Sequence, residues 1–134
     1  MLFRSGGPDR ARLAEAVTLD TRSKIIPLSR AGEFAGAAFV SMHLDPLTVE
    51  HARRLAVIAA QGKPVVVLLT DPPSPLLPIG ARAELAAALA SVSAVMIVDG
   101  PVSVLPLIAE EGADLQRRHA LVQHVLARHA AATA

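Results

Sequence analysis

The chain has 134 residues, of which 52% are hydrophobic, 19% charged and 2% aromatic, and its formal net charge is +1. This length fits one domain with a single core, and the hydrophobic surplus argues against a disordered chain. The near-neutral charge and the few aromatic residues argue against a nucleic-acid interface. The absence of cysteine excludes disulfides, thiolate metal sites and a cysteine nucleophile.

The N-terminal stretch 1–23 is expected to be an extension of a single domain that covers 1–134. Two glycines and a proline in 1–8 indicate a loose lead-in, and 9–17 is compatible with a short helix. A loop or short helix is expected over 21–34. Neither a signal peptide nor an apolar run of the ~18 residues that a membrane span requires is recognisable. We therefore expect a cytoplasmic protein that binds no membrane.

From residue 36 onward, short apolar runs alternate with segments of helical periodicity. Strands are expected over 36–42, 64–70 and 92–99 because these runs are short, apolar and partly β-branched. Helices are expected over 48–62, 79–91 and 113–131. Four prolines in 71–78 exclude regular structure there, and 100–112 is expected to form a turn and a short helix.

The alternation of strands and helices predicts the fold class. It is typical of βαβ units, and hence of an α/β three-layer sandwich whose mainly parallel sheet has helices on both faces. Ligands of open parallel sheets bind beyond the carboxyl ends of the strands. The segments expected there are 43–51, 71–78 and 99–103.

Several pieces of the sequence, taken in order, resemble one known family. The run Lys24-Ile25-Ile26-Pro27-Leu28 resembles its lead-in, and 44–51 (LDPLTVEH) is similar to its F-D-x-x-H-x-G-H motif. Asp71 ends the next strand, and 82–95 is similar to its R-x-x-x-L-x-A-L-x-x-V-D-x-V helix. Over roughly residues 24–110 the chain thus resembles the cytidylyltransferase-like nucleotidyltransferases. Within them it is most similar to the adenylyltransferase domain of the bifunctional heptose-phosphate kinase/adenylyltransferase.

The resemblance implies a reaction and a set of site residues. The expected reaction transfers a nucleotidyl group from ATP or CTP to a sugar phosphate or similar phosphate acceptor, with Mg²⁺ as cofactor. His51 matches the second histidine of the motif and is expected to contact the phosphates, and Thr48 is expected to substitute for the first histidine as a hydroxyl donor. Asp45, Leu44 and Arg82 complete the expected nucleotide-binding set.

Three departures from the family pattern predict impaired activity. Glu50 replaces the motif glycine, which adds bulk and negative charge where a phosphate would approach the start of the helix. The segment before the last helix, 110–118 (EEGADLQRR), lacks the family's Ser/Thr pair, and 71–78 lacks its basic residues. The alternative is therefore a catalytically degenerate family member that acts as a ligand-binding or protein-interaction module.

The residues alone leave other roles open for the same side chains. His51 is also compatible with a polar position in the first turn of a helix, and His43 with either a loop residue or a replacement for the missing histidine. Asp45 suits Mg²⁺ binding or a helix cap, and Asp71 suits Mg²⁺ binding or a turn before proline. Thr48 is first of all a helix N-cap.

The remaining charged and apolar residues predict surface properties. Arg53, Arg54 and Arg82 are interpreted as helix-surface charges. His119, His124 and His129 recur every five residues, so they do not share a helix face and do not predict a metal site. The aliphatic surplus and the alanine-rich helices indicate apolar surface beyond one core, which predicts a homodimer.

Overall fold

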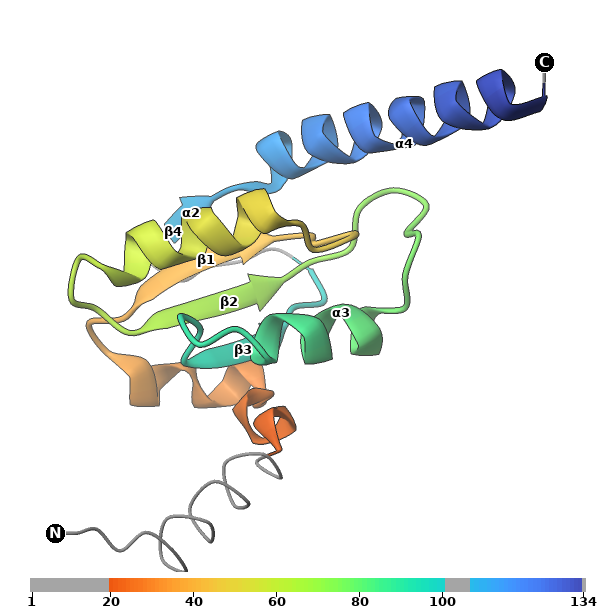
Figure 1. Ribbon diagram of the computed structural model, residues 1–134. Coiled ribbons are helices and arrows are strands. Elements are labelled where there is room, and N and C mark those ends of the chain that lie inside the picture. The colour runs from red at the N-terminus through yellow and green to blue at the C-terminus, as the bar shows by residue number, and fades with distance from the viewer. Residues whose placement is uncertain (1–19, 101–106, 134) are drawn as a thin grey trace, which may run out of the picture.

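The strands form one parallel sheet in the order β3-β2-β1-β4 (Figure 1). A computed structural model describes residues 20–100 and 107–133 of the chain. The strands are β1 (Ala38–Met42), β2 (Val65–Leu69), β3 (Ala94–Ile97) and β4 (Leu107–Ala109). β1 pairs with β2 on one side and with β4 on the other, and every pairing is parallel.

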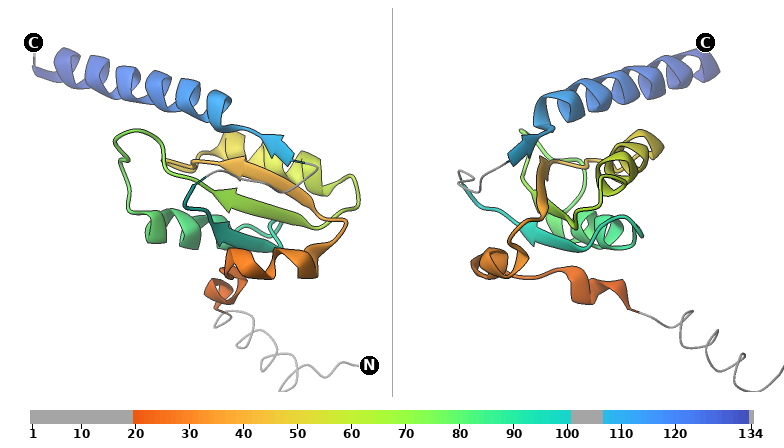
Figure 2. Two further views of the ribbon diagram at one scale, coloured as in Figure 1. Left: turned by 180° about the vertical axis from the view of Figure 1, so that it is seen from behind. Right: turned by 90° about the vertical axis from the view of Figure 1, so that its left-hand side faces the viewer.

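Helices cover both faces of the sheet, so the predicted α/β three-layer sandwich is confirmed. Helices α2 (Val49–Ala59) and α3 (Ile79–Ala87) lie on one face, and the 3₁₀ helix η2 (Leu28–Phe34) lies on the other (Figure 2). A second 3₁₀ helix, η1 (Thr21–Lys24), comes before η2.

The hydrophobic core has two parts, one on each face of the sheet, because successive side chains of a strand point to opposite faces. In β2, Val65, Val67 and Leu69 pack toward α2 and α3, whereas Val66 and Leu68 pack toward η2. Both faces are covered here. All five residues of β2 are consequently buried, as its uninterrupted aliphatic run predicts.

The segment 107–109 was predicted within a short helix, and this prediction is wrong. It forms strand β4, in which Leu107 and Ile108 pair with Phe39 and Val40 of β1. A three-residue edge strand carries too little pattern to be distinguished from a helix turn, and pairing with a preformed neighbour decides its conformation. Residues 101–106 of the predicted turn and short helix lie outside the described residues, as does the predicted helix over 9–17.

Local sequence signals explain where α2 begins and ends. Thr48 is the N-cap of α2, as predicted, and takes part in a capping box with His51. The chain leaves α2 before Gly62, which has φ +90°. Helix α3 ends at Ala87, four residues earlier than its predicted end.

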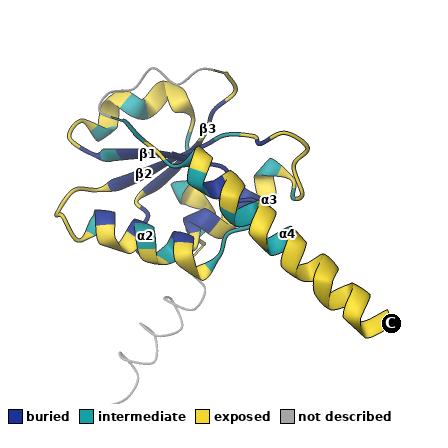
Figure 3. Cartoon of the chain, turned by 90° about the horizontal axis from the view of Figure 1, so that it is seen from above, coloured by how far each residue is buried: buried dark blue, intermediate teal, exposed yellow. Residues whose placement is uncertain are grey.

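Helix α4 (Glu111–Thr133) starts on the sheet and then leaves it (Figure 3). Its first two turns contact the body, whereas every residue from Gln123 to Thr133 is exposed. We call residues 119–133 the α4 arm. Within the described ranges, no helix combines the length and the apolar character needed to cross a bilayer.

The strand order places a topological switch point beside β1. The chain proceeds from β1 to β2 and β3 on one side and later adds β4 on the other side of β1. In open sheets of this kind the ligand crevice opens at the carboxyl ends of the two strands that flank the switch point. Here that edge lies directly under the start of α4, because α4 begins two residues after β4 ends.

Candidate functional site at the carboxyl edge of the sheet

Asp114, in the first turn of α4, is the centre of the polar contacts at this edge. Its buried carboxylate accepts hydrogen bonds through Oδ2 from the backbone N–H groups of His43 (2.8 Å) and Leu44 (3.4 Å). Its Oδ1 lies 2.7 Å from Nε2 of His51. Asp114 thus joins α4 to the end of β1 and to the first turn of α2.

Both ring nitrogens of His51 already have partners. Nδ1 accepts the backbone N–H of Thr48 at 2.9 Å, so the ring proton lies on Nε2, which donates to Asp114. The Thr48 hydroxyl lies 2.9 Å from the same Nδ1. The imidazole is buried. The predicted phosphate contact of His51 stays a prediction, and in this arrangement neither ring nitrogen is free to make it.

The environment of Asp114 favours its ionised form. Burial alone would raise the pKa of the carboxyl group, because it penalises the charged state. The hydrogen bonds from His51 and from the backbone of His43 and Leu44 outweigh that effect and lower the pKa below its usual value. The negative charge is therefore built into the edge of the sheet.

A second carboxylate of α4 bridges two strand ends. Oε1 of Glu111 accepts from the Ser41 hydroxyl at 2.6 Å, and Oε2 accepts from the Thr70 hydroxyl at 2.9 Å. The backbone N–H of Glu110 also donates to the Ser41 carbonyl at 2.9 Å, just beyond β4. The start of α4 is therefore fixed to β1 and to the residue after β2.

Asp45 anchors the proline-rich loop 71–78. Its two carboxylate oxygens accept the backbone N–H groups of Leu76 (2.7 Å) and Leu77 (2.8 Å). Arg118 of α4 approaches the same carboxylate at 3.5 Å and donates to the carbonyls of Pro73 and Ser74. The alternative that Asp45 caps α2 is wrong, because Thr48 occupies that position.

The interpretation of Arg82 as a helix-surface charge is wrong. Its side chain is fully buried, and its guanidinium donates to the carbonyls of His43 (2.9 Å), Thr70 (3.1 Å) and Leu77 (3.1 Å). A fourth hydrogen bond joins it to the Asp71 carboxylate. The five donors of a guanidinium suit such a junction. Arg82 thus links the ends of β1 and β2 to the loop 71–78.

Glu50 and Leu44 lie differently from what the family motif implies. The Glu50 side chain is 66% exposed, and its carboxylate lies 3.3 Å from Nε of Arg117 on α4. The Leu44 side chain is part of the core beneath α2 and α3, so only its backbone faces the edge. Glu50 therefore does not point into the sheet; it helps to hold α4.

His43 is a buried residue, and no hydrogen bond to its ring joins it to the contacts described above. Its Nδ1 has no hydrogen-bond partner among the described residues. Burial lowers the pKa of this imidazole, although the nearby carboxylates of Asp114 and Glu111 act in the opposite direction. The ring is therefore held in its neutral form, a poor counter-charge for a phosphate.

The carboxylates expected to hold Mg²⁺ fit the ion poorly. Asp45 uses both oxygens on backbone N–H groups, and Asp71 is paired with Arg82. Among residues 20–100 and 107–133, no cluster of three or more His, Asp or Glu side chains is arranged to bind a metal. We therefore derive no metal-dependent step from this edge.

The sequence reasoning missed the residues of α4 that organise the edge. Glu111, Asp114 and Arg118 lie three or four residues apart, a spacing that places them on one face of a helix. In the sequence, the run 110–118 is noticed first because it lacks the Ser/Thr pair of the family pattern. Its i, i+3 and i, i+4 acidic and basic pattern was the available signal for a helix face that contacts polar strand ends.

An apolar groove lies beside this polar edge. It has a volume of about 280 Å³ and runs between the loop 71–78 and the α4 arm. Its lining consists of Pro46, Leu76, Leu77, Leu121, Val122, Val125 and Leu126. The site therefore combines internally paired carboxylates with an open apolar surface.

Comparison of the sequence with models of known protein families found no match, and comparison with curated protein sequences found none either.

Proposed function

We propose that this chain is a catalytically degenerate member of the nucleotidyltransferase-like fold that acts as a protein-interaction module. The observation that carries the proposal is the contact of Asp114 with His51 and with the backbone of His43 and Leu44. Through it, α4 covers the strand ends at which a nucleotide of such a fold would bind.

The charges at the edge support the same conclusion. Asp114 and Glu111 are carboxylates over the ends of β1 and β2, and Arg82 is already engaged with carbonyls and Asp71. Two unit charges of one sign at ~4 Å repel by about 4 kcal/mol near a protein surface. A triphosphate would meet this repulsion and would also have to displace the first turn of α4.

The enzymatic alternative rests on a smaller set of contacts. Thr48 and His51 lie together at the start of α2, as the family motif requires. Transfer from ATP or CTP to a sugar phosphate would need His51 to exchange Asp114 for a phosphate, and α4 to move. It remains the second candidate, and the cytoplasmic location likewise stays a prediction.

Calorimetric titration with ATP and with CTP, each with and without Mg²⁺, separates the two candidates. The interaction-module proposal expects no heat of binding up to millimolar nucleotide. Micromolar binding that disappears in His51→Ala and persists in the exposed variant Arg53→Ala would contradict it. Circular dichroism of both variants verifies that the fold is retained.

A further inference from the structure

We propose that the α4 arm and the apolar groove beside it form the interface of an isologous homodimer, in which the arms of two copies lie antiparallel. This inference rests on the proposed function as an interaction module and names its partner, a second copy of this chain. The interface would consist of Leu115, Leu121, Val122, Val125 and Leu126 on α4 together with Pro46, Leu76 and Leu77.

The arm carries an apolar stripe that the body of the protein leaves uncovered. Val125 and Leu126 are 55% and 56% exposed, and Leu76 across the groove is 53% exposed. These residues follow Leu121 and Val122 at helical spacing, so they share a face. A continuous apolar face of this kind on a helix and a neighbouring loop marks an interaction surface.

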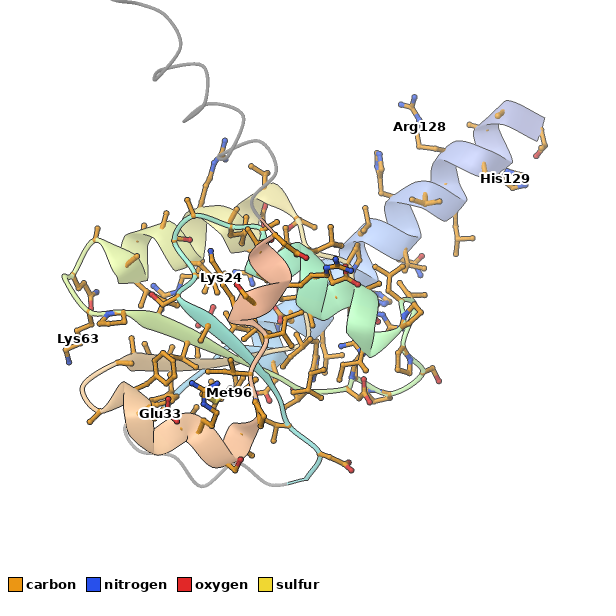
Figure 4. All side chains as sticks on the ribbon, turned by 90° about the horizontal axis from the view of Figure 1, so that it is seen from below. Lys24, Glu33, Lys63, Met96, Arg128 and His129 are labelled. Carbon is orange, nitrogen blue, oxygen red and sulfur yellow. The ribbon has the colours of Figure 1, made fainter. Side chains whose placement is uncertain are left out.

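The arm also lacks the packing that stabilises a helix in water. All residues from Gln123 to Thr133 are exposed, and isolated helices shorter than ~12–15 residues are marginal even when rich in alanine. Contact with a partner along the stripe would supply the missing burial. Figure 4 shows Arg128 and His129 on this outer part of α4, away from the sheet.

The order of residues along the arm favours a second copy in the antiparallel orientation. In an antiparallel pair centred between Val122 and Val125, Leu121 lies opposite Leu126 and Val122 opposite Val125, so the apolar stripe faces itself. The same pairing sets Arg128 opposite His119, whereas a parallel pair would place Arg128 beside Arg128.

The size of the arm indicates that the groove takes part. Residues 119–133 span about 22 Å, and a helix is ~10 Å wide, so two arms alone would bury roughly 450 Å² in total. A specific interface needs about 1,000 Å² or more. The difference requires the partner's arm to contact Pro46, Leu76 and Leu77 as well.

A lipid surface fits the same stripe less well. Interfacial helices combine several Lys or Arg residues with Trp or Phe, whereas the arm has no aromatic residue and Arg128 as its one permanent cation.

Light scattering after size exclusion tests the dimer. The wild-type chain is expected to be dimeric at tens of micromolar, and Val125→Asp and Leu126→Asp are each expected to raise the dimer Kd roughly tenfold or more. Ala127→Asp introduces the same charge on the opposite face of the helix and is expected to remain dimeric. A monomeric wild type, or equal loss in Ala127→Asp, would overturn the proposal.

Engineered cysteines test the orientation, because the chain has none of its own. On oxidation, the double variant Val122→Cys/Val125→Cys is expected to form a covalent dimer, whereas Thr133→Cys is not, since antiparallel tips lie far apart. The opposite pattern would refute the antiparallel arrangement.

Binding of a monomeric chain to phosphatidylserine–phosphatidylcholine vesicles would also overturn the proposal. Nucleotide binding by a dimeric chain would refute the proposed function alone.

Discussion

At the scale of single residues, the carboxyl edge of the sheet depends on how each polar group is satisfied. Asp114 accepts from four N–H groups, those of the His43 and Leu44 backbone and of the His51 and Arg117 side chains. Arg82 donates to three carbonyls and one carboxylate. Removing one partner of such a buried set leaves the others unpaired, which costs more than the intact bonds contribute. His51 therefore helps to hold α4, and Arg82 holds the loop 71–78 against the strand ends.

Substitution of Asp114 by asparagine should reveal this role. Asparagine has one acceptor oxygen, so its NH₂ group would face an N–H donor of His51 or of the His43 backbone. We expect a loss of about 1–3 kcal/mol in the free energy of unfolding at pH 7, measured by urea denaturation. Asp114→Glu, which keeps the charge but displaces it, is the control for electrostatics alone.

The pH dependence of that loss follows from the lowered pKa of Asp114. The folded protein holds the carboxylate ionised, so its contribution to stability is full above the unfolded-state pKa of about 3.9. It is lost as the pH falls from there through the lower folded-state pKa. The stability difference between wild type and Asp114→Asn should therefore shrink below about pH 4. A difference that stays constant down to pH 2 would contradict this assignment.

At the scale of helices and strands, local signals explain most boundaries. The aliphatic run of β2, the threonine cap of α2 and the prolines of 71–78 each act through nearest neighbours, and their predicted conformations are confirmed. β4 was missed because its three residues become a strand only through pairing with β1. The role of Arg82 was missed for a related reason, since the carbonyls that it binds come from segments up to 39 residues away.

Gly62, which follows α2, and Gly80, which lies in α3, should respond oppositely to substitution by alanine. Gly62 has φ +90° after α2, a conformation that strains an alanine, whereas Gly80 lies inside α3 with open space where a methyl group would be added. Gly62→Ala is expected to lower the free energy of unfolding by about 1 kcal/mol. Gly80→Ala is expected to raise it by about 0.5–1 kcal/mol. Thermal or urea denaturation measures both, and equal effects would contradict the assignment of backbone conformations.

At the scale of the whole molecule, α4 combines two unlike functions. Its first two turns close the switch-point edge with carboxylates, and its outer turns project an apolar stripe beyond the body. The order of strands and helices was predictable, because each βαβ unit consists of consecutive residues. The closure of the edge was not, because the pattern of 110–118 indicates a polar helix face but not its partners, which lie at 41–51.

Truncation should separate the two functions of α4. A chain that ends at Val122 keeps the contacts of Glu111, Asp114 and Arg118, and the described residues that it removes, 123–133, are all exposed. Its free energy of unfolding should lie within about 1 kcal/mol of that of the monomeric full-length variant Val125→Asp. This comparison removes the concentration-dependent contribution of dimerisation.

A chain that ends at Ala109 exposes the strand ends and leaves the backbone N–H groups of His43 and Leu44 without Asp114. It should be destabilised by several kcal/mol, and hydrogen exchange of those two amides should accelerate strongly. If instead the shorter chain is as stable as the longer one, the start of α4 does not hold the edge of the sheet.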